Sequence, residues 1–539
     1  MEFLKLAFEL RFLPLTLSVI GAPFFFAVAM VSPIFGGFFL LLSATLVGLS
    51  ALGFRDLVQT RHSILRTHPI SAHLRFLLET MRPEIRQYFF EDDKGGAPFS
   101  RDKRALVYQR AKGELDKRPF GTEYDVYSEG FEYIRHSIAP AAPGDGPLRT
   151  TIGAGRPQPY SASIFNISAM SFGALSANAI RALNAGAKRG GFAHDTGEGG
   201  VSSYHRENGG DLVWEIGSGY FGCRDDHGNF APDLFAKAAA DPQIKMVELK
   251  LSQGAKPGHG GVLPAAKLTP EIAAIRGVPL GRDCVSPARH SAFSTPIELI
   301  RFVDEMRRLS GGKPAGFKLC IGQPSEFLAI CKAMLETGLR PDFIVVDGKE
   351  GGTGAAPLEF MDHLGMPMRD GLNFVHNALV GVGLRDRIRL GAAGKIVSAF
   401  DVARAMALGA DWCNSARGFM FALGCIQSQS CHTDRCPTGV ATQDASRARG
   451  LVVSDKAERV YNFHRSTLAT LAELTAAAGL EHPEGFTTAH FARRVSPREV
   501  VGFEELYPAL APGELIAGCE DRRFRDAWAR ARPDRFAGG

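Results

Sequence analysis

The sequence predicts an α/β protein whose main part is a (β/α)8 TIM barrel, preceded by a transmembrane helical hairpin and a mixed pre-barrel segment. From about residue 160, short apolar runs such as SIFNIS and KMVELKL alternate with helical patterns over about 300 residues, the order and length of a parallel barrel. Glycine clusters follow the strand-like runs, where such a barrel carries its functional loops. A doubly wound sheet is the alternative, but the strings GAGRP and GVGLRD lack the third glycine of a dinucleotide-binding turn.

The hairpin is predicted by a run of 43 residues without a charge between Arg11 and Arg55, roughly twice the length that crosses a bilayer. The string SPIFGG, residues 32–37, divides this run into two spans. Lys5 and Arg11 precede the run and further basic residues follow it. The positive-inside rule therefore places both ends of the hairpin, and the barrel, on the cytoplasmic side of the cell membrane. A cleaved signal peptide and a buried helical pair are the alternatives.

The chain is expected to divide into four segments. These are the hairpin over 1–55, the pre-barrel segment over 56–148, the barrel over 149–475 and a C-terminal extension over 476–539 without chemistry of its own. The net charge is only +5 and the sequence shows no basic tract with interleaved aromatic residues, so no nucleic acid partner is expected. Six of the nine cysteines are scattered singly, which favours a reducing compartment over a disulfide-stabilised secreted fold.

Six glycine-rich stretches mark the ends of the strand-like runs. Glycine permits a close approach of backbone to ligand, and the later loops of a barrel commonly hold a phosphate. The stretches therefore predict a phosphate-bearing cofactor, the alternative being tight turns that need glycine for steric reasons alone. They are SAMSFGALS (168–176), DTGEGG (195–200), KLSQGAKPGHGG (250–261), DGKEGGTGAAP (347–357), GAAG (391–394) and NSARGFM (414–420).

Three cysteines, Cys425, Cys431 and Cys436, lie close together in GCIQSQSCHTDRCPTGVATQ, residues 424–443. A disulfide would leave one thiol unpaired. A structural zinc site would need a fourth ligand, and His432 is awkwardly placed directly beside Cys431. Three thiolates on one loop, with a proline after the last, favour an iron–sulfur cluster, either [3Fe–4S] or [4Fe–4S] with one non-cysteine ligand.

Taken together, these strings closely resemble the central FMN-binding domain of glutamate synthases. ISAMSFGALS, TGEGG, QGAKPGHGG, DGKEGGTGAAPL and the cysteine segment occur in the family's order over roughly residues 150–470. The resemblance implies a (β/α)8 barrel that holds FMN and a [3Fe–4S] cluster. It also implies reduction of 2-iminoglutarate, formed from 2-oxoglutarate and ammonia, to L-glutamate.

The resemblance also implies a role for each matching residue. Ala169, Met170 and Ser171 would lie against the flavin ring near Thr196 and Gly197, and Gln253 and Lys318 would reach its pyrimidine edge. Glu198 and Lys250 are the expected catalytic residues, with Lys250 also binding substrate. Gly351, Gly352, Thr353, Gly394, Ala416 and Arg417 would hold the phosphate, and Cys425, Cys431 and Cys436 would ligate iron.

The chain departs from the family in ways that bear on the substrate. Full glutamate synthases begin with an amidotransferase domain, which is not expected here because Met1 leads into the hairpin and no cysteine precedes Cys223. Ammonia would then come from solution or from a partner, or be replaced by another amine, as in a subunit of N-methylglutamate synthase. PGHGG carries His259 where the family has Glu, and SPARHSAF (286–293) places Arg289 near the expected substrate mouth.

Two functions follow from these expectations. The first is a membrane-anchored oxidoreductase of the glutamate synthase type, which acts on 2-oxoglutarate or a related oxoacid and an amine. The alternative is a flavin and iron–sulfur electron-transfer subunit, docked on a membrane or on a ferredoxin-linked partner. The electron donor stays open between ferredoxin, a separate flavoprotein and a quinone-linked complex, because no dinucleotide-binding fingerprint is visible.

Overall fold

The computed structural model describes residues 7–144 and 146–536. It divides into two compact units, Met1–Arg101 and Asp102–Gly539, and each is described by itself.

The N-terminal unit is helical and begins with two long apolar helices, α2 (Leu13–Val31) and α3 (Gly36–Val58), which pack against each other. The Ser43 hydroxyl donates a hydrogen bond of 2.7 Å to the Ala22 carbonyl across the pair. A Cβ added at Gly53 would lie 2.6 Å from Cδ1 of Leu15, so the small residue allows the close packing. The two predicted apolar helices on either side of SPIFGG are therefore present, and both are long and apolar enough to cross a membrane.

Further along this unit, three shorter helices follow α3: α4 (Ser63–Thr67), α5 (Ala72–Ile85) and a π-helical turn, η1 (Arg86–Phe90). Asp56, near the end of α3, accepts hydrogen bonds from the Ile70 N–H at 3.0 Å and from the His73 ring at 2.9 Å. These contacts fix the turn between α3 and α5.

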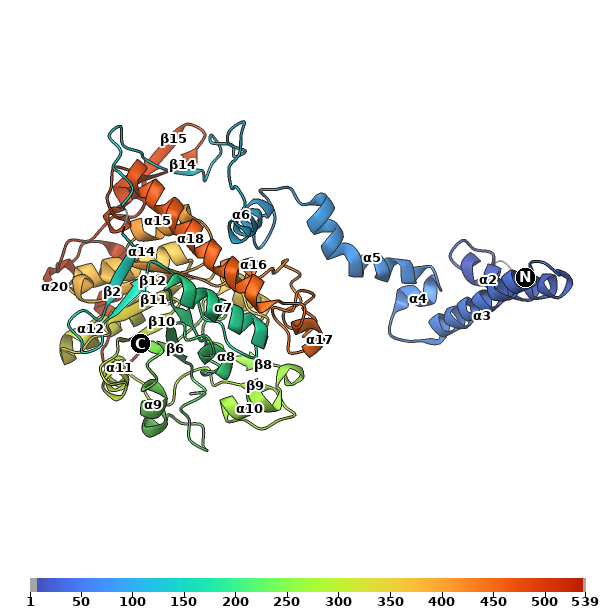
Figure 1. Ribbon diagram of the computed structural model, residues 1–539, viewed down its shortest axis with the longest axis horizontal. Coiled ribbons are helices and arrows are strands. Elements are labelled where there is room, and N and C mark those ends of the chain that lie inside the picture. The colour runs from blue at the N-terminus through green and yellow to red at the C-terminus, as the bar shows by residue number, and fades with distance from the viewer. Residues whose placement is uncertain (1–6, 145, 537–539) are drawn as a thin grey trace. The chain divides into compact units, whose positions relative to one another are not determined.

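The larger unit contains a closed barrel of eight parallel strands (Figure 1). Neighbouring strands follow each other around the barrel in chain order, and the last strand pairs with the first. The predicted TIM barrel is therefore confirmed. The strands are β4 (Phe165–Ile167), β5 (His194–Asp195), β6 (Leu212–Ile216), β7 (Ile244–Lys250), β10 (Ala315–Leu319), β11 (Phe343–Asp347), β12 (Arg389–Ala393) and β13 (Trp412–Ser415).

Helices surround the strands, and their ends follow local sequence signals. The helix α11 begins with a capping box of Thr295 and Glu298 and carries Pro296 in its first turn. Ser176 caps the start of α7, and Gly191 ends it in the left-handed conformation. The outer helices are α7 (Ala177–Gly190), α9 (Pro232–Ala239), α11 (Pro296–Leu309), α12 (Pro324–Thr337), α14 (Met368–Gly381), α15 (Ala399–Ala407) and α18 (Val453–Ala477).

A β-hairpin of β2 (Arg149–Ile152) and β3 (Tyr160–Ser163) closes the end of the barrel where the strands begin. Its buried Ile152 and Tyr160 join one apolar cluster with Val213, Phe343 and Trp412 near the strand starts. The opposite end, where the strands stop, is therefore left for the functional loops.

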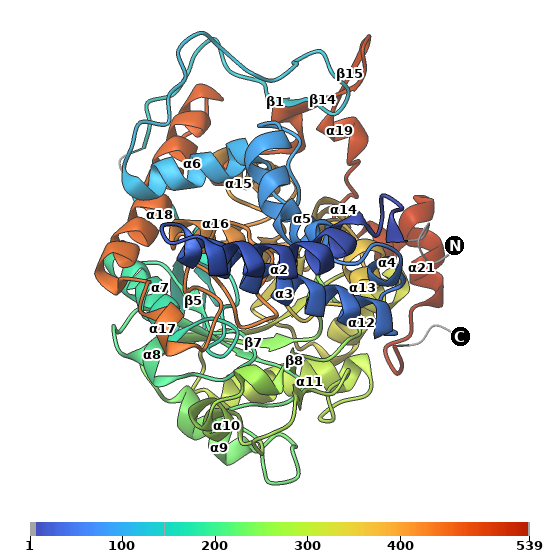
Figure 2. The same ribbon diagram turned by 90° about the vertical axis from the view of Figure 1, so that its right-hand side faces the viewer.

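The pre-barrel segment and the C-terminal extension share a small sheet, in the order β1 (Glu132–Ile134), β14 (Phe491–Ser496) and β15 (Glu499–Gly502). Figure 2 shows this sheet at one side of the barrel, with α19 (Phe503–Leu506) beside it. Glu132 forms ion pairs with Arg369, Arg404 and Arg493 at 2.5 to 2.7 Å, which join β1 to the barrel helices and to β14.

Candidate active site

The loops that follow β4 and β5 lie against each other at the carboxyl end of the barrel. The Met170 N–H donates to the Asp195 carbonyl at 3.0 Å, and a Cβ added at Gly197 would lie 3.0 Å from the Ser171 nitrogen. Gly197 has a φ of +64°, a conformation that favours glycine. The structure therefore brings together the two stretches predicted to face a flavin ring, Ala169–Ser171 and Thr196–Gly197.

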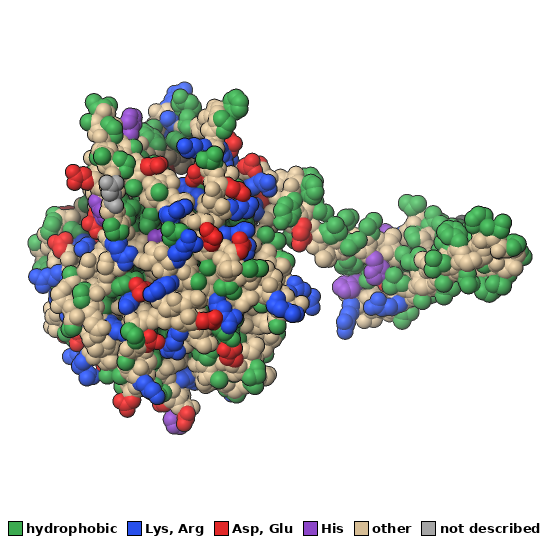
Figure 3. All heavy atoms as spheres, in the orientation of Figure 1, with side chains coloured by type: hydrophobic (Ala, Val, Ile, Leu, Met, Phe, Trp, Pro, Cys, Tyr) green, Lys and Arg blue, Asp and Glu red, His purple; other side chains and the backbone are tan. Residues whose placement is uncertain are grey.

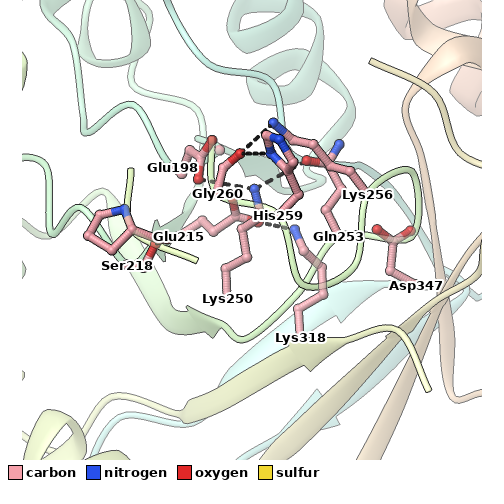
Figure 4. Close-up of polar contacts among 12 residues, drawn as sticks. Glu198, Glu215, Ser218, Lys250, Gln253, Lys256, His259, Gly260, Lys318 and Asp347 are labelled. Atoms are coloured by element: carbon pink, nitrogen blue, oxygen red, sulfur yellow. Dashed lines mark hydrogen bonds and ion pairs between the residues drawn. The ribbon is translucent and has the colours of Figure 1, made fainter. Parts of the chain in front are cut away.

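Glu198, Lys250 and Gln253 form a connected polar group beside these loops (Figure 4). The Lys250 ammonium lies 3.1 Å from Oε2 of Glu198 and donates to Oε1 of Gln253 at 3.2 Å. Lys250 is the last residue of β7, so the strand fixes its position. A Cβ on Gly261 would clash with the Glu198 carboxylate, so a larger residue there would displace that carboxylate. The two predicted catalytic residues are thus in direct contact.

Two further buried cations in this region were not predicted as site residues. Lys256 is 3% exposed and donates to the Gly260 carbonyl at 2.9 Å. Arg276 ends α10 (Pro270–Arg276) and is 5% exposed, and its Nε has no hydrogen-bond partner among the described residues. A Cβ on Gly199 would lie 3.0 Å from Nη2 of Arg276, which places the guanidinium against the loop after β5. Lys256 stands inside the quoted QGAKPG string, whereas nothing in the sequence pattern singled out Arg276.

The charges around Glu198 hold it in the ionised form. Burial raises the pKa of its carboxyl, but the charges of Lys250, Lys256 and Arg276 outweigh this and leave the pKa below its ordinary value. Burial lowers the pKa of the Lys256 ammonium, and the Glu198 charge opposes that shift. Three cations therefore face one carboxylate, and the group carries a surplus of positive charge.

A second group of charges lies deeper in the barrel, around Lys318 of β10. Its ammonium contacts Glu215, lies 3.3 Å from Oε1 of Glu248 and lies 3.8 Å from Oδ2 of Asp195, and all four residues are buried. Burial is the main cause that raises the pKa of Asp195, Glu248 and Asp347, and it does so most strongly for Glu248. Burial therefore shifts the titration of these carboxyls toward the protonated form, and the Lys318 charge opposes that shift for Asp195 and Asp347. Figure 4 shows Lys318 and Asp347 below Gln253 and Lys256 in that view.

His290, next to the predicted Arg289, contacts the polar site through its ring. Its Nε2 hydrogen-bonds with the Lys250 carbonyl at 2.8 Å and its Nδ1 with the Tyr220 hydroxyl at 3.1 Å, and burial lowers the pKa of the ring to about 4. Arg289 is exposed. His259 is half-buried, and its Nδ1 lies 2.8 Å from the Gly260 carbonyl that also accepts from Lys256.

The residues predicted to hold a phosphate come from the loops after β11, β12 and β13. Arg417 donates from Nη2 to the Gly352 carbonyl at 2.9 Å, which ties the last loop to the β11 loop. A guanidinium has five N–H donors, so this bond leaves others for an anion. Ala416 directly precedes Arg417 at the start of α16 (Arg417–Ala422), and Gly394 follows β12. Gly351 and Thr353 flank Gly352 in the β11 loop.

The three cysteines lie on one loop that follows α16. Cys425 and Cys436 are buried and Cys431 is half-buried. Gln427, Gln429 and Asp434 have φ values of +56° to +63°, a conformation rare for residues other than glycine. Burial raises the pKa of the Cys436 thiol, but hydrogen bonds from the Ala441, Thr438 and Val440 N–H groups and from the Thr438 hydroxyl leave it below its ordinary value.

The cysteine loop is joined to the loops of the polar site. Lys267, on the short η2 (Ala265–Lys267), is 3% exposed and donates to the carbonyls of Ala174 at 2.9 Å, Cys431 at 3.4 Å and Ala441 at 3.3 Å. Gln443 donates to the Gly173 and Leu175 carbonyls, and Ser176 donates to the Gly439 carbonyl. A Cβ on Gly354 of the β11 loop would lie 3.1 Å from the Cys431 carbonyl carbon. Lys267 was not predicted from the sequence.

The donor sets fit the two predicted groups. Among the described residues, one group of potential metal ligands has its ligand atoms within 4.8 Å of one another: Asp195, Glu215 and Glu248. The Lys318 ammonium already supplies a positive charge at this place. The three cysteines share one loop, with Pro437 after the last, and three thiolates of this kind suit an iron–sulfur cluster. Arg417 and the glycine-lined backbone around it suit a phosphate.

Comparison with known proteins identifies the family. The family description "Conserved region in glutamate synthase" matches residues 147–481, which contain all eight barrel strands and the cysteine loop. The chain belongs to the glutamate synthase family. The glutamate synthase large subunit-like protein YerD of Bacillus subtilis is 35% identical over 494 residues, which cover 84% of this chain and 94% of YerD. The resemblance stated from the motifs is therefore confirmed.

Other members of the glutamate synthase family match a shorter region. The archaeal-type NADPH glutamate synthase of Thermotoga neapolitana is 35% identical over 315 residues, 58% of this chain and 58% of that protein. The archaeal NADPH glutamate synthase of Methanocaldococcus jannaschii is 34% identical over 319 residues, 59% of each chain. Among solved structures, a flavocytochrome b2 variant aligns with a TM-score of 0.42 at 11% identity, over 84% of this chain and 93% of that one.

Proposed function

We propose that this chain reduces the imine of a dicarboxylic oxoacid, 2-oxoglutarate or a close relative, with ammonia or a simple amine as the nitrogen source. The product would be glutamate or an N-substituted glutamate. The observation that supports this most directly is the set of three buried or nearly buried cations, Lys250, Lys256 and Arg276, around the single carboxylate of Glu198. Their surplus of two positive charges matches the two carboxylates of the oxoacid.

In this proposal the side chains have separate tasks. Lys256 and Arg276 bind the substrate carboxylates, because a buried guanidinium and a buried ammonium form strong charge-assisted hydrogen bonds. Glu198 stays ionised and faces the iminium nitrogen, where its negative charge favours the cationic imine over the neutral one. Lys250 holds Glu198 in place through their 3.1 Å contact. FMN, when bound, supplies the two electrons that reduce the imine carbon.

The same proposal assigns FMN and a [3Fe–4S] cluster to the remaining predicted residues. The loops of Ala169–Ser171 and Thr196–Gly197, which lie side by side, would face the flavin ring. Gln253 and Lys318 would lie toward its pyrimidine edge, and Arg417 would bind its phosphate together with Gly351, Gly352, Thr353, Gly394 and Ala416. Cys425, Cys431 and Cys436 would ligate the iron, and an external ferredoxin, flavoprotein or quinone-linked donor would supply electrons.

We also infer that α2 and α3 anchor the protein in the cell membrane, with the barrel in the cytoplasm. Support comes from their length and apolar composition, from their mostly exposed apolar side chains and from the basic residues that follow α3. Resistance of the full chain to extraction from membranes by alkaline carbonate tests the anchoring separately from the chemistry.

The decisive experiment uses the full chain purified without oxygen in detergent. Flavin extraction and iron analysis establish the cofactors, and the flavin absorbance is then titrated with 2-oxoglutarate. Turnover is measured with a chemically reduced viologen as electron donor, with ammonium or methylamine as the nitrogen source. We expect saturable spectral changes and an amino acid product. Bound flavin without any response to 2-oxoglutarate would refute the substrate assignment, and failure of the isolated chain to turn over would favour the electron-transfer alternative.

A further inference from the structure

The helix α5 carries a continuous apolar stripe that faces solvent. Leu74, Leu77, Leu78 and Met81 follow the i, i+3, i+4, i+7 spacing of one helix face. Their exposed fractions are 60%, 54%, 52% and 47%. The chain continues into η1, where Phe89 and its neighbours are also strongly exposed. A stripe of this length on a helix that packs mainly on its neighbours α4 and η1 calls for an external partner.

Three arginines follow one flank of the same stripe. Arg75, Arg82 and Arg86 are spaced by seven and four residues, so they stack on one side of the helix, about 100° from Leu74. All three are exposed. By the same geometry Glu84 lies on the opposite flank of the stripe, about 280° from Leu74, and Glu79 lies farther from the stripe than the arginines, at about 140°. The helix therefore presents an apolar stripe with a basic border.

The position of α5 in the chain indicates what covers this stripe. Residues 59–71 separate it from α3, whose apolar side chains are exposed, and this connection carries Arg61 and Arg66. Figure 3 shows hydrophobic side chains covering the α2–α3 pair on the face in view. A helix that follows a membrane span and has an apolar stripe with a basic border matches the pattern of helices that lie in the lipid headgroup layer. The basic border complements anionic headgroups.

We propose that α5 lies along the surface of an anionic bilayer, with the stripe of Leu74, Leu77, Leu78 and Met81 in the acyl boundary. Arg75, Arg82 and Arg86 contact the lipid phosphates. The inference rests on insertion of the α2–α3 pair and is independent of the redox chemistry, so each can fail without the other. It gives the anchor a third contact with the membrane, which fixes the direction in which the chain leaves it.

Depth in the bilayer can be measured on the full chain in lipid nanodiscs. Leu78→Trp places a fluorophore on the stripe, and the matched control Glu79→Trp places one on the neighbouring residue of the polar side. The signal of Trp214, Trp412 and Trp528 is subtracted with the unchanged protein. Lipids brominated on the acyl chain should quench the Leu78→Trp fluorescence by roughly half and leave Glu79→Trp almost unchanged. Equal quenching of the two would overturn the proposal.

Lipid charge is tested by hydrogen exchange of residues 72–90 in nanodiscs of phosphatidylcholine with or without phosphatidylglycerol. We expect slower exchange in the anionic discs, and loss of that difference when Arg75, Arg82 and Arg86 are replaced by Gln. The control, Glu79→Gln with Glu84→Gln, should keep the difference. Exchange that is equally slow in both discs, or that slows only with rising protein concentration, would assign the stripe to a protein contact and contradict the inference. Flavin turnover in the same samples reports on the catalytic proposal independently.

Discussion

Replacing Arg276 by Gln tests the assignment of the substrate site most directly. The side chain is 5% exposed, its Nε has no hydrogen-bond partner among the described residues, and Nη2 borders the loop after β5 near Gly199. Nη1 donates to the Cys284 sulfur at 3.8 Å and the guanidinium lies over the Phe221 ring, so it is positioned before any ligand arrives. Glutamine keeps a polar group of smaller size but removes the charge and the fork of N–H donors that a carboxylate requires.

The size of the effect follows from the contact that is removed. A hydrogen bond to a charged group contributes about 1.5 to 3 kcal/mol, and each 1.36 kcal/mol is a factor of ten. Binding of 2-oxoglutarate should weaken roughly 10- to 150-fold. A monocarboxylic oxoacid such as 2-oxobutyrate can bind through the Lys256 ammonium alone. Its affinity should therefore fall less than that of 2-oxoglutarate, and the preference of the variant for the dicarboxylate should decrease.

The assay is a titration of flavin absorbance with each oxoacid, after flavin content and thermal stability of the variant have been compared with the parent protein. Arg224→Gln is the matched control. The guanidinium groups of Arg224 and Arg276 both lie over the Phe221 ring, 5.7 and 5.1 Å from its centre. The Arg224 guanidinium lies against Gly228, whereas that of Arg276 lies against Gly199 in the loop after β5. An Arg276→Gln protein that binds 2-oxoglutarate with the parent affinity, or an equal loss in Arg224→Gln, would refute the reasoning.

Three further substitutions test other parts of the site. Lys250→Met removes the largest charge that lowers the pKa of Glu198, so the acidic limb of the pH profile of kcat/KM should move to higher pH; an unmoved limb would contradict Glu198 as the ionised group. Lys318→Met leaves the buried Glu215 without its cation, so the free energy of unfolding measured with urea should fall by about 3 kcal/mol. In the control Lys318→Arg, the free energy of unfolding should change little. Lys267→Met leaves three backbone carbonyls without their donor, so iron retention during gel filtration should fall roughly tenfold. Lys267→Arg should keep most of the iron. Full iron retention in Lys267→Met would exclude a role of Lys267 in holding the cysteine loop.

The alternation of strand and helix patterns was sufficient to predict the barrel, because buried parallel strands and amphipathic helices leave distinct periods in the sequence. The same pattern placed Glu198 and Lys250 at strand ends, and such residues meet at one end of a barrel whatever the loop details. The topology places both residues at the same end of the barrel, and in the structure they lie 3.1 Å apart. The uninterrupted apolar run likewise predicted the α2–α3 pair, since 43 residues without a charge exceed one span.

Residues on the long connection between β7 and β10 could not be placed in this way. Before α11 begins at Pro296, residues 251–295 fold into a two-stranded sheet of β8 (Val262–Leu263) and β9 (Cys284–Val285), with η2 and α10 between the strands, and tertiary contacts alone decide which side chains turn inward. Arg276 and Lys267 are buried by these contacts. The string SPARHSAF drew attention to its arginine because a cation suits an oxoacid, yet Arg289 is exposed and the adjacent His290 is buried.

Hydrogen bonds connect the cysteine loop to the loop after β4, which borders the polar site around Glu198. Lys267, Gln443 and Ser176 join backbone groups of the loop after β4 to the segment around the cysteines, and these bonds are buried or partly buried. Buried hydrogen bonds of this kind are costly to break, so the two loops cannot shift independently. A cluster held by the cysteines and a flavin held beside Met170 would therefore keep a fixed separation, which electron transfer between them requires. The charged residues also form two groups, with Lys250, Lys256 and Arg276 around Glu198 and the acidic residues Glu215 and Glu248 around Lys318.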